Sequence, residues 1–89
     1  MEWDAEKDAQ NRVKHGMGLG DAVLLEWDAR LEIIDDRQDY GEDRLRAIAP
    51  LGSRLHACVY TIRLGQVRVI SLRKANTREA RHYEQSRAR

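Results

Sequence analysis

The spacing of apolar residues changes along the chain, and the first part has a helical period. The residues at this spacing are Ala5, Ala9 and Val13. Asp4 precedes them as an N-cap residue, and Gly16 follows as a C-terminal stop. The pattern therefore predicts a helix over residues 5–15.

A glycine-rich turn, GMGLG, separates this helix from a second apolar group. The turn lacks the spacing of a phosphate-binding loop and is interpreted as a linker. The apolar residues that follow predict a short second helix over residues 21–27. Glu2 and Trp3, ahead of the first helix, are interpreted as a short strand or a lead-in.

From Leu31 onward the period changes toward two, which is typical of strands. The predicted strands cover residues 31–35, 43–49, 54–63 and 66–73. Their short connections predict an antiparallel meander. Asn76 and Glu79 form a capping-box pattern that predicts a final helix over residues 77–86. The predicted fold is a single α+β domain over residues 1–89, with two N-terminal helices, a four-stranded antiparallel sheet and a C-terminal helix.

Charge divides this pattern into two halves. Residues 21–43 hold nine acids and two bases, a net charge of −7, whereas residues 44–89 hold eleven bases and two acids, a net charge of +9. The basic half favours an anionic partner, nucleic acid first, and the acidic half a basic partner. Pairing of the two charge sets across the fold is an equal alternative on charge alone.

Several classes of function are disfavoured. The single cysteine, Cys58, lies in an apolar run and is expected to be a buried, inert thiol in a reducing compartment. The acids near Asp35 lack the spacing of a metal site, so neither a metal nor another cofactor is expected. No apolar run approaches the roughly 20 residues of a membrane helix, so we expect a cytoplasmic protein without membrane contact.

The remaining candidate chemistry is basic. Arginine matches phosphate because its planar fork donates two hydrogen bonds and keeps its charge. The bases in and after the last predicted strand are Arg63, Arg68, Arg73, Lys74, Arg78 and Arg81, followed by His82 and Tyr83. The first helix adds Lys7, Asn11, Lys14 and His15 on one side, although their spacing alone favours a solvated helix face. From the residues alone, anion binding is favoured over catalysis.

A resemblance to a known family shifts this balance. Glu2, Trp3, Asp4, Lys7, Asn11 and Lys14-His15-Gly16 resemble the opening EWDxxKxxxNxxKHG of the BrnT family of ribonuclease toxins. Later blocks are also similar: Gly41, Glu42 and Arg44, then Val59-Tyr60-Thr61, Arg68-Val69-Ile70-Ser71 with Arg73, and Arg78-Glu79 with Tyr83-Glu84. The likeness covers nearly the whole chain. Leu72 departs from it, because a small residue is usual there, and its bulk would narrow a site beside Arg73.

The resemblance implies a RelE-like fold and an endoribonuclease that stops translation. It also implies neutralisation by a BrnA-like antitoxin with a ribbon-helix-helix domain, through which alone DNA would be contacted. In this hypothesis Arg73 and Arg68 stabilise the phosphorane and Tyr83 or His15 transfers protons, without a metal. The residues expected to place the RNA are Lys7, Asn11, Lys14, Arg63, Lys74, Arg78 and Arg81. The alternative is a non-catalytic module that binds RNA or an antitoxin.

Overall fold

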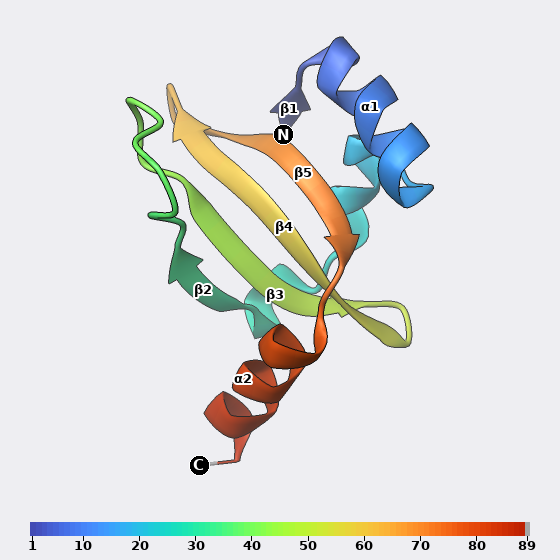
Figure 1. Ribbon diagram of the computed structural model, residues 1–89, viewed down its shortest axis with the longest axis vertical. Coiled ribbons are helices and arrows are strands. Elements are labelled where there is room, and N and C mark those ends of the chain that lie inside the picture. The colour runs from blue at the N-terminus through green and yellow to red at the C-terminus, as the bar shows by residue number, and fades with distance from the viewer. Residues whose placement is uncertain (89) are drawn as a thin grey trace.

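A five-stranded mixed sheet forms the centre of the protein, and the computed structural model describes residues 1–88 (Figure 1). In chain order the elements are β1 (Glu2–Trp3), α1 (Ala5–His15), the 3₁₀ helices η1 (Leu19–Leu24) and η2 (Trp27–Ala29), β2 (Leu31–Ile34), β3 (Leu45–Leu51), β4 (Arg54–Arg63), β5 (Gln66–Lys74) and α2 (Thr77–Arg87). The strand order across the sheet is β1-β5-β4-β3-β2. The α+β class is therefore confirmed.

The two α-helices begin and end as their capping residues predict. The Asp4 carboxylate accepts a hydrogen bond from the backbone N–H of Lys7 at 3.0 Å, and Gly16 adopts a left-handed φ of 72°. At the start of α2, Asn76 and Glu79 each accept from the other's backbone N–H, as in a capping box. Local hydrogen bonding thus fixes both helix starts.

The prediction of a second α-helix over residues 21–27 is wrong, because this segment forms two 3₁₀ helices. The buried residues of the segment are Leu19, Ala22 and Leu25. Their spacing of three matches the three residues per turn of a 3₁₀ helix, so this helix directs all three into the core. Val23 and Leu24 remain exposed.

The prediction of a four-stranded, purely antiparallel sheet is also wrong in detail. The four predicted strands are present and antiparallel, but β1 adds a fifth strand parallel to β5, with Glu2 beside Arg68 and Trp3 beside Val69. A strand of two residues shows no periodicity, so its pairing depends on where the rest of the fold places it.

A bulge interrupts the pairing of β4 with β5. Tyr60 pairs with Val69 and the adjacent Val59 pairs with Ser71, so Ile70 is an extra residue on β5. As a result, Val69 and Leu72 both enter the same core cluster although they are three residues apart. The alternation of side chains along β5 therefore changes phase at Ile70.

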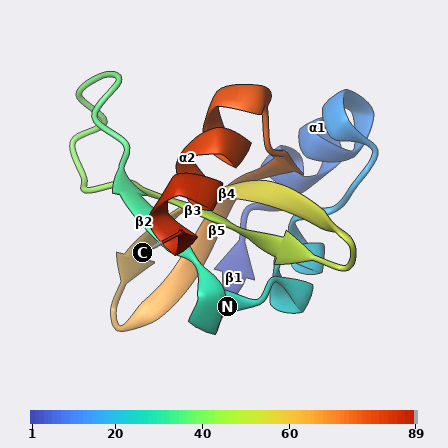
Figure 2. The ribbon, with the colours of Figure 1, turned by 90° about the horizontal axis from the view of Figure 1, so that it is seen from below.

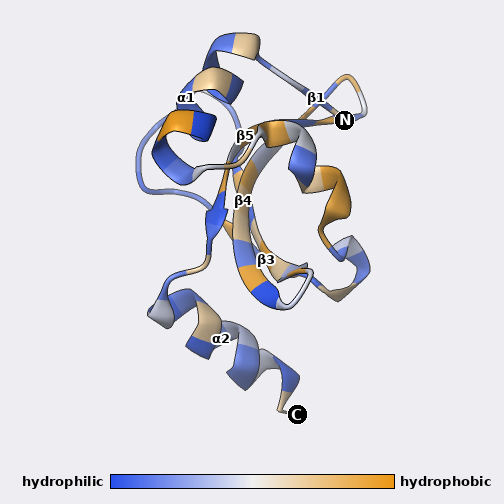
Figure 3. Ribbon diagram, turned by 90° about the vertical axis from the view of Figure 1, so that its right-hand side faces the viewer, coloured by the Kyte–Doolittle hydropathy of each residue, from blue (hydrophilic) through white to orange (hydrophobic). Residues whose placement is uncertain are grey.

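The two faces of the sheet have different covers (Figure 2). On one, here called the η face, η1 and η2 pack over a core that includes Ala47, Cys58, Tyr60 and Leu72. On the other, here called the α2 face, a smaller cluster joins α2 to the sheet; its buried residues are Ile48, Ala57, Ala75 and Tyr83. Figure 3 shows hydrophobic colour concentrated in η1 and the strands, whereas α2 is mostly hydrophilic. Each cover leaves part of its face open.

The acidic and basic halves of the chain remain largely separate. Within residues 1–88, the one acid of segment 21–43 that forms an ion pair with a base of the second half is Glu42, which contacts Arg44 and Arg63. The structure thus favours partners for the two charge sets over mutual pairing. No helix in the described part of the chain has the length and apolarity to cross a membrane.

Candidate functional site

The open part of the α2 face carries rows of basic and small residues. The strand register places Arg46 of β3, Val59 of β4 and Ser71 of β5 in one row across the sheet. The next row ends at Arg73, which lies opposite Ala57. Because neighbouring strands lie about 4.8 Å apart, these rows bring the basic residues of β3 and β5 onto one compact surface.

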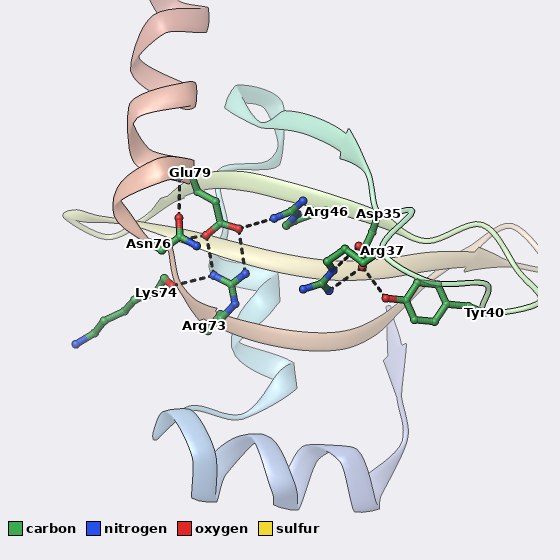
Figure 4. A network of polar contacts seen from close by, with 8 residues as sticks. All are labelled: Asp35, Arg37, Tyr40, Arg46, Arg73, Lys74, Asn76 and Glu79. Carbon is green, nitrogen blue, oxygen red and sulfur yellow. Dashed lines mark hydrogen bonds and ion pairs between the residues drawn. The ribbon is translucent and has the colours of Figure 1, made fainter.

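Glu79 of α2 binds both arginines of this surface (Figure 4). The Arg73 guanidinium donates to the two carboxylate oxygens at 2.7 and 2.9 Å, and Arg46 donates to one of them at 2.8 Å. The Glu79 side chain is 5% exposed, whereas those of Arg46 and Arg73 are 19% and 24% exposed. The first turn of α2 thus holds two partly accessible guanidinium groups beside each other.

Burial disfavours the ionised form of Glu79, but its hydrogen bonds outweigh this effect. Donors from Arg73, from the backbone N–H of Asn76 and from Arg46 lower the pKa of Glu79 to about 2. The carboxylate is therefore ionised at neutral pH, and the two guanidinium groups with this carboxylate carry a net charge of +1. The cluster retains positive charge for an anion.

Arg46 was not among the residues that the sequence singled out. Its Nε is buried and has no hydrogen-bond partner, although its Nη1 binds Glu79. The sequence could have identified it, because Arg46 lies in a predicted strand between Leu45 and Ala47, whose side chains face the core on the η face. Alternation alone would have placed Arg46 on the opposite face.

A second ionic group borders this surface at the end of β2 (Figure 4). Asp35 is buried, and Arg37 donates to both of its carboxylate oxygens at 2.7 and 2.9 Å. Hydrogen bonds from Arg37 lower the pKa of Asp35. Asp35 is thus engaged in a local ion pair, whereas the nearby Asp36 and Asp39 are exposed.

Helix α1 closes the other side of the surface, where it packs beside β5. A hollow of about 130 Å³ lies between them, lined by Lys7, Gln10, Asn11, Lys14, His15, Ile70 and Ser71. Lys7, Lys14 and His15 are exposed on the helix. Ser71 lies in the same row as Arg46 and precedes Arg73 by two residues. The hollow that Ser71 lines therefore brings the predicted bases of α1 and β5 to one region.

Asn11 lies at the bottom of this region but is buried. Its amide nitrogen donates to the carbonyl groups of Met17 and Leu72, and its amide oxygen accepts from the backbone N–H of Leu72. These bonds use the side chain fully, so its placement favours a structural role over the predicted RNA contact. The helix packs through this polar side, whereas Val13 of the apolar stripe is 89% exposed.

Arg68 is further along β5 on the α2 face, where it pairs with Thr61. Its guanidinium lies 3.4 Å from the Glu2 carboxylate, and both side chains are partly exposed. An exposed ion pair of this kind is weak and exchanges readily with another anion. Arg68 is therefore partly accessible to an anion at the edge of the surface.

Tyr83 is buried between α2 and the sheet, one helical turn after Glu79. It packs in the cluster of Ile48 and Ala57, its hydroxyl donates to the Ala29 carbonyl at 3.1 Å, and it accepts from Arg87 at 3.0 Å. This environment favours Tyr83 as the residue that attaches α2 to the sheet. The placement gives no support to the predicted role in proton transfer.

The other predicted RNA contacts are peripheral. Lys74, Arg78 and Arg81 are exposed, and Arg63 forms an ion pair with Glu42 at 3.2 Å. Leu72 is fully buried on the η face, opposite Arg73, and so does not narrow the site as expected. Burial raises the pKa of the Cys58 thiol to about 12, in agreement with an inert thiol.

Residues 1–88 contain no group of three or more His, Cys, Asp or Glu side chains arranged to hold a metal ion. The chain matched no curated protein and no solved structure, so the RelE-like form of the fold stays a prediction. A family model described as "Ribonuclease toxin, BrnT, of type II toxin-antitoxin system" matches residues 3–79. This range contains α1, the four longer strands of the sheet and the Glu79 cluster, and the chain therefore belongs to the BrnT family of ribonuclease toxins.

Proposed function

We propose that this chain is an endoribonuclease that cleaves RNA without a metal ion and thereby inhibits translation. The observation that carries the proposal is the meeting of α1 and β5, where Lys14 and His15 border the same sheet surface as Arg73. Family membership supports a ribonuclease toxin with an antitoxin partner. The mechanism is inferred from the side chains at this surface.

In the proposed reaction the ribose 2′-oxygen attacks the adjacent phosphorus, and the bond from phosphorus to the 5′-oxygen breaks. The 2′-hydroxyl loses a proton, the 5′-oxygen gains one, and the products are a 2′,3′-cyclic phosphate and a 5′-hydroxyl end. His15 transfers one of these two protons, and the other is exchanged with the solvent water. His15 is preferred to Tyr83 because it is exposed beside the hollow.

The arginines stabilise the negative charge that develops on the phosphorane. Arg73 and Arg46 are held in place by Glu79, so they need little rearrangement when the charge appears. Arg68 and the lysines of α1 contact neighbouring phosphates. The exposed bases Lys74, Arg78 and Arg81 extend this contact along the RNA backbone.

An assay of RNA cleavage in EDTA tests the proposal. The wild-type chain should cleave RNA, and His15→Ala should lower the rate by about 100-fold or more. Arg73→Ala and Arg73→Lys should also lose most activity, the lysine variant because it keeps the charge without the planar fork. Arg54→Ala is the matched control, since Arg54 is exposed at the start of β4 and forms no ion pair in the described chain.

Two outcomes contradict the proposal: RNA left intact by a high concentration of wild-type chain, or full activity in His15→Ala. Unfolding curves of each variant separate loss of chemistry from loss of fold. A non-catalytic RNA-binding module is the second candidate, favoured by the engagement of both Arg73 terminal nitrogens with Glu79. That candidate requires RNA binding without cleavage in the same assay.

A further inference from the structure

The uncovered end of the η face is apolar. The strand register places Ile34, Leu45, Tyr60 and Val69 in one row across four strands. Tyr60 and Val69 of this row are buried in the core cluster, where Trp27 of η2 packs edge-on against Tyr60 with the ring centroids 5.2 Å apart, so the cover ends beyond these two residues. Ile34 and Ile62 are consequently 70% and 54% exposed. Neighbouring apolar side chains that remain exposed on a small domain mark an interaction surface.

Two adjacent hollows give this surface its shape. The larger, of about 480 Å³, is lined by Met1, Trp27, Arg30, Glu32, Leu45, Tyr60, Ile62 and Val67. The second, of about 420 Å³, is lined by Ile34, Glu42, Asp43, Leu45, Thr61 and Ile62. Leu45 and Ile62 line both, so the two hollows are neighbours; together they are here called the groove, and their lining comes from β2, β3, β4 and β5.

The rim of the groove comes largely from the acidic segment 21–43. The charged residues that line it are Glu32, Glu42, Asp43 and Arg30. Glu32 pairs with Arg30 and Glu42 pairs with Arg44 and Arg63, whereas Asp43 forms no ion pair in the described chain. Further acids of segment 21–43 are exposed: Asp21, Glu26, Asp28, Asp36 and Asp39. Such a surface attracts lysine and arginine and repels nucleic acid.

The β2 strand adds an available backbone edge. It is the last strand in the sheet order, and no strand within residues 1–88 pairs with its outer side. Ile34 at its end is also part of the groove. An extended peptide can add to an edge of this kind and place alternate side chains in neighbouring pockets.

We propose that this groove is the docking surface for the antitoxin. The occupant is a segment with apolar side chains that enter the two hollows and with flanking lysines or arginines that meet the acidic rim. The inference rests on the proposed function, because it is the toxin that requires such a partner. It also separates the two contacts of the toxin: the antitoxin is anchored on the η face, whereas RNA is bound on the α2 face.

The separation is tested with the chain and the antitoxin of its own toxin–antitoxin module, purified apart and mixed. Ile62→Asp places a charge in both hollows and should weaken the complex at least about tenfold, as expected for a central apolar contact. Val13→Asp is the matched control, because Val13 is also an exposed apolar residue but lies on α1. The control should bind the antitoxin like the wild type.

RNA cleavage in the absence of antitoxin is measured for the same three proteins. Ile62→Asp should retain the wild-type rate, which shows that the variant is folded and that its defect concerns docking. If the wild-type chain does not cleave RNA, the proposed function fails, while the comparison of affinities still decides the docking surface.

Amide hydrogen exchange on the wild-type complex gives a second measurement that needs no variant. The antitoxin should slow exchange in β2 and at the end of β4 near Ile62. Equal affinity of Ile62→Asp and the wild type, or slowed exchange confined to α1 and α2, would overturn the proposal.

Discussion

Asn11 occupies a place on the edge of β5 that a neighbouring strand would otherwise fill. Beyond the two residues of β1, the outer edge of β5 has no strand partner in the described chain. Asn11 replaces one locally, because its amide both donates to the carbonyl and accepts from the N–H of Leu72. The sequence offered a polar residue on a basic helix face, which predicted an RNA contact instead.

Replacing Asn11 by alanine should destabilise the fold by about 3 kcal/mol, since three hydrogen bonds are lost and buried backbone groups are left unpaired. Gln10→Ala, on the exposed side of the same helix, should change stability by less than about 0.5 kcal/mol. Urea unfolding measures both values. Similar stability of the two variants would disprove the structural role of Asn11.

Glu79 should make stability depend on acid pH. Its folded-state pKa of about 2 lies below the ordinary value of 4.5. Its contribution to the free energy of unfolding is therefore fully present above pH 4.5 and is lost as the pH falls toward 2. Glu79→Gln should cost on the order of 2 kcal/mol at pH 7, less than in a fully buried pair because both arginines remain partly exposed.

The measurement is urea unfolding of the wild type and Glu79→Gln at several pH values between 2 and 7. The difference between the two proteins should shrink below pH 4.5. Glu84→Gln, which changes an exposed residue of the same helix, is the control. A difference that stays constant across this range would argue against an ionised Glu79 as the stabilising species.

At the scale of elements, capping residues and alternation predicted α1, α2 and the four longer strands well. They did not predict the features that depend on tertiary packing. The bulge at Ile70 is the clearest case: strict alternation would place Arg68 and Arg73 on opposite faces of β5 because they are five residues apart. The extra residue puts both on the α2 face. Bulges are common next to functional sites for this reason.

The candidate site was predictable only in part, because it also depends on tertiary packing. The bases of α1 and β5 were identified from their types and order, but whether they meet depends on how α1 packs against the sheet edge. Arg46 was missed because its partner Glu79 lies 33 residues away in sequence. Tyr83 was assigned to chemistry through the family resemblance, and its position in the sequence gives no sign that its hydroxyl reaches the Ala29 carbonyl.

Removal of the Tyr83 hydroxyl tests the attachment of α2. Tyr83→Phe loses the bond to Ala29 and should cost about 1 kcal/mol of stability. The rate of RNA cleavage should stay close to that of the wild type at temperatures where the variant is folded. Thermal unfolding and the cleavage assay give the two values. A large loss of activity in a stable variant would support a role of Tyr83 in proton transfer.

At the scale of the whole molecule, a single sheet separates two surfaces of opposite character. Neighbouring residues of one strand serve different surfaces: Leu45 lines the apolar groove, whereas Arg46 belongs to the basic cluster. The charge asymmetry of the sequence predicted two partners, and the strand register adds that the apolar groove and the basic cluster lie on opposite faces of the sheet. The overall charge of +1 conceals this division.

RNA affinity should fall steeply with salt, because binding by the basic surface releases counterions from the RNA. If four of its bases contact phosphates, the logarithm of the affinity should fall with the logarithm of salt concentration with a slope of about −3 for single strands. Titration of a non-cleavable RNA with a 2′-deoxy substitution measures the slope. Arg46→Ala should reduce its magnitude by about 0.7, and Arg54→Ala should leave it unchanged.

The bulge also determines where the chain can change length. Because Ile70 is the unpaired extra residue, its deletion leaves every other pair of β4 and β5 in register and keeps Ser71 and Arg73 on their face. Deletion of Val69 would instead remove a core side chain and break the pairing with Tyr60. Related chains that lack one residue in this strand should therefore align with a gap opposite Ile70, while their arginines still point to the same surface.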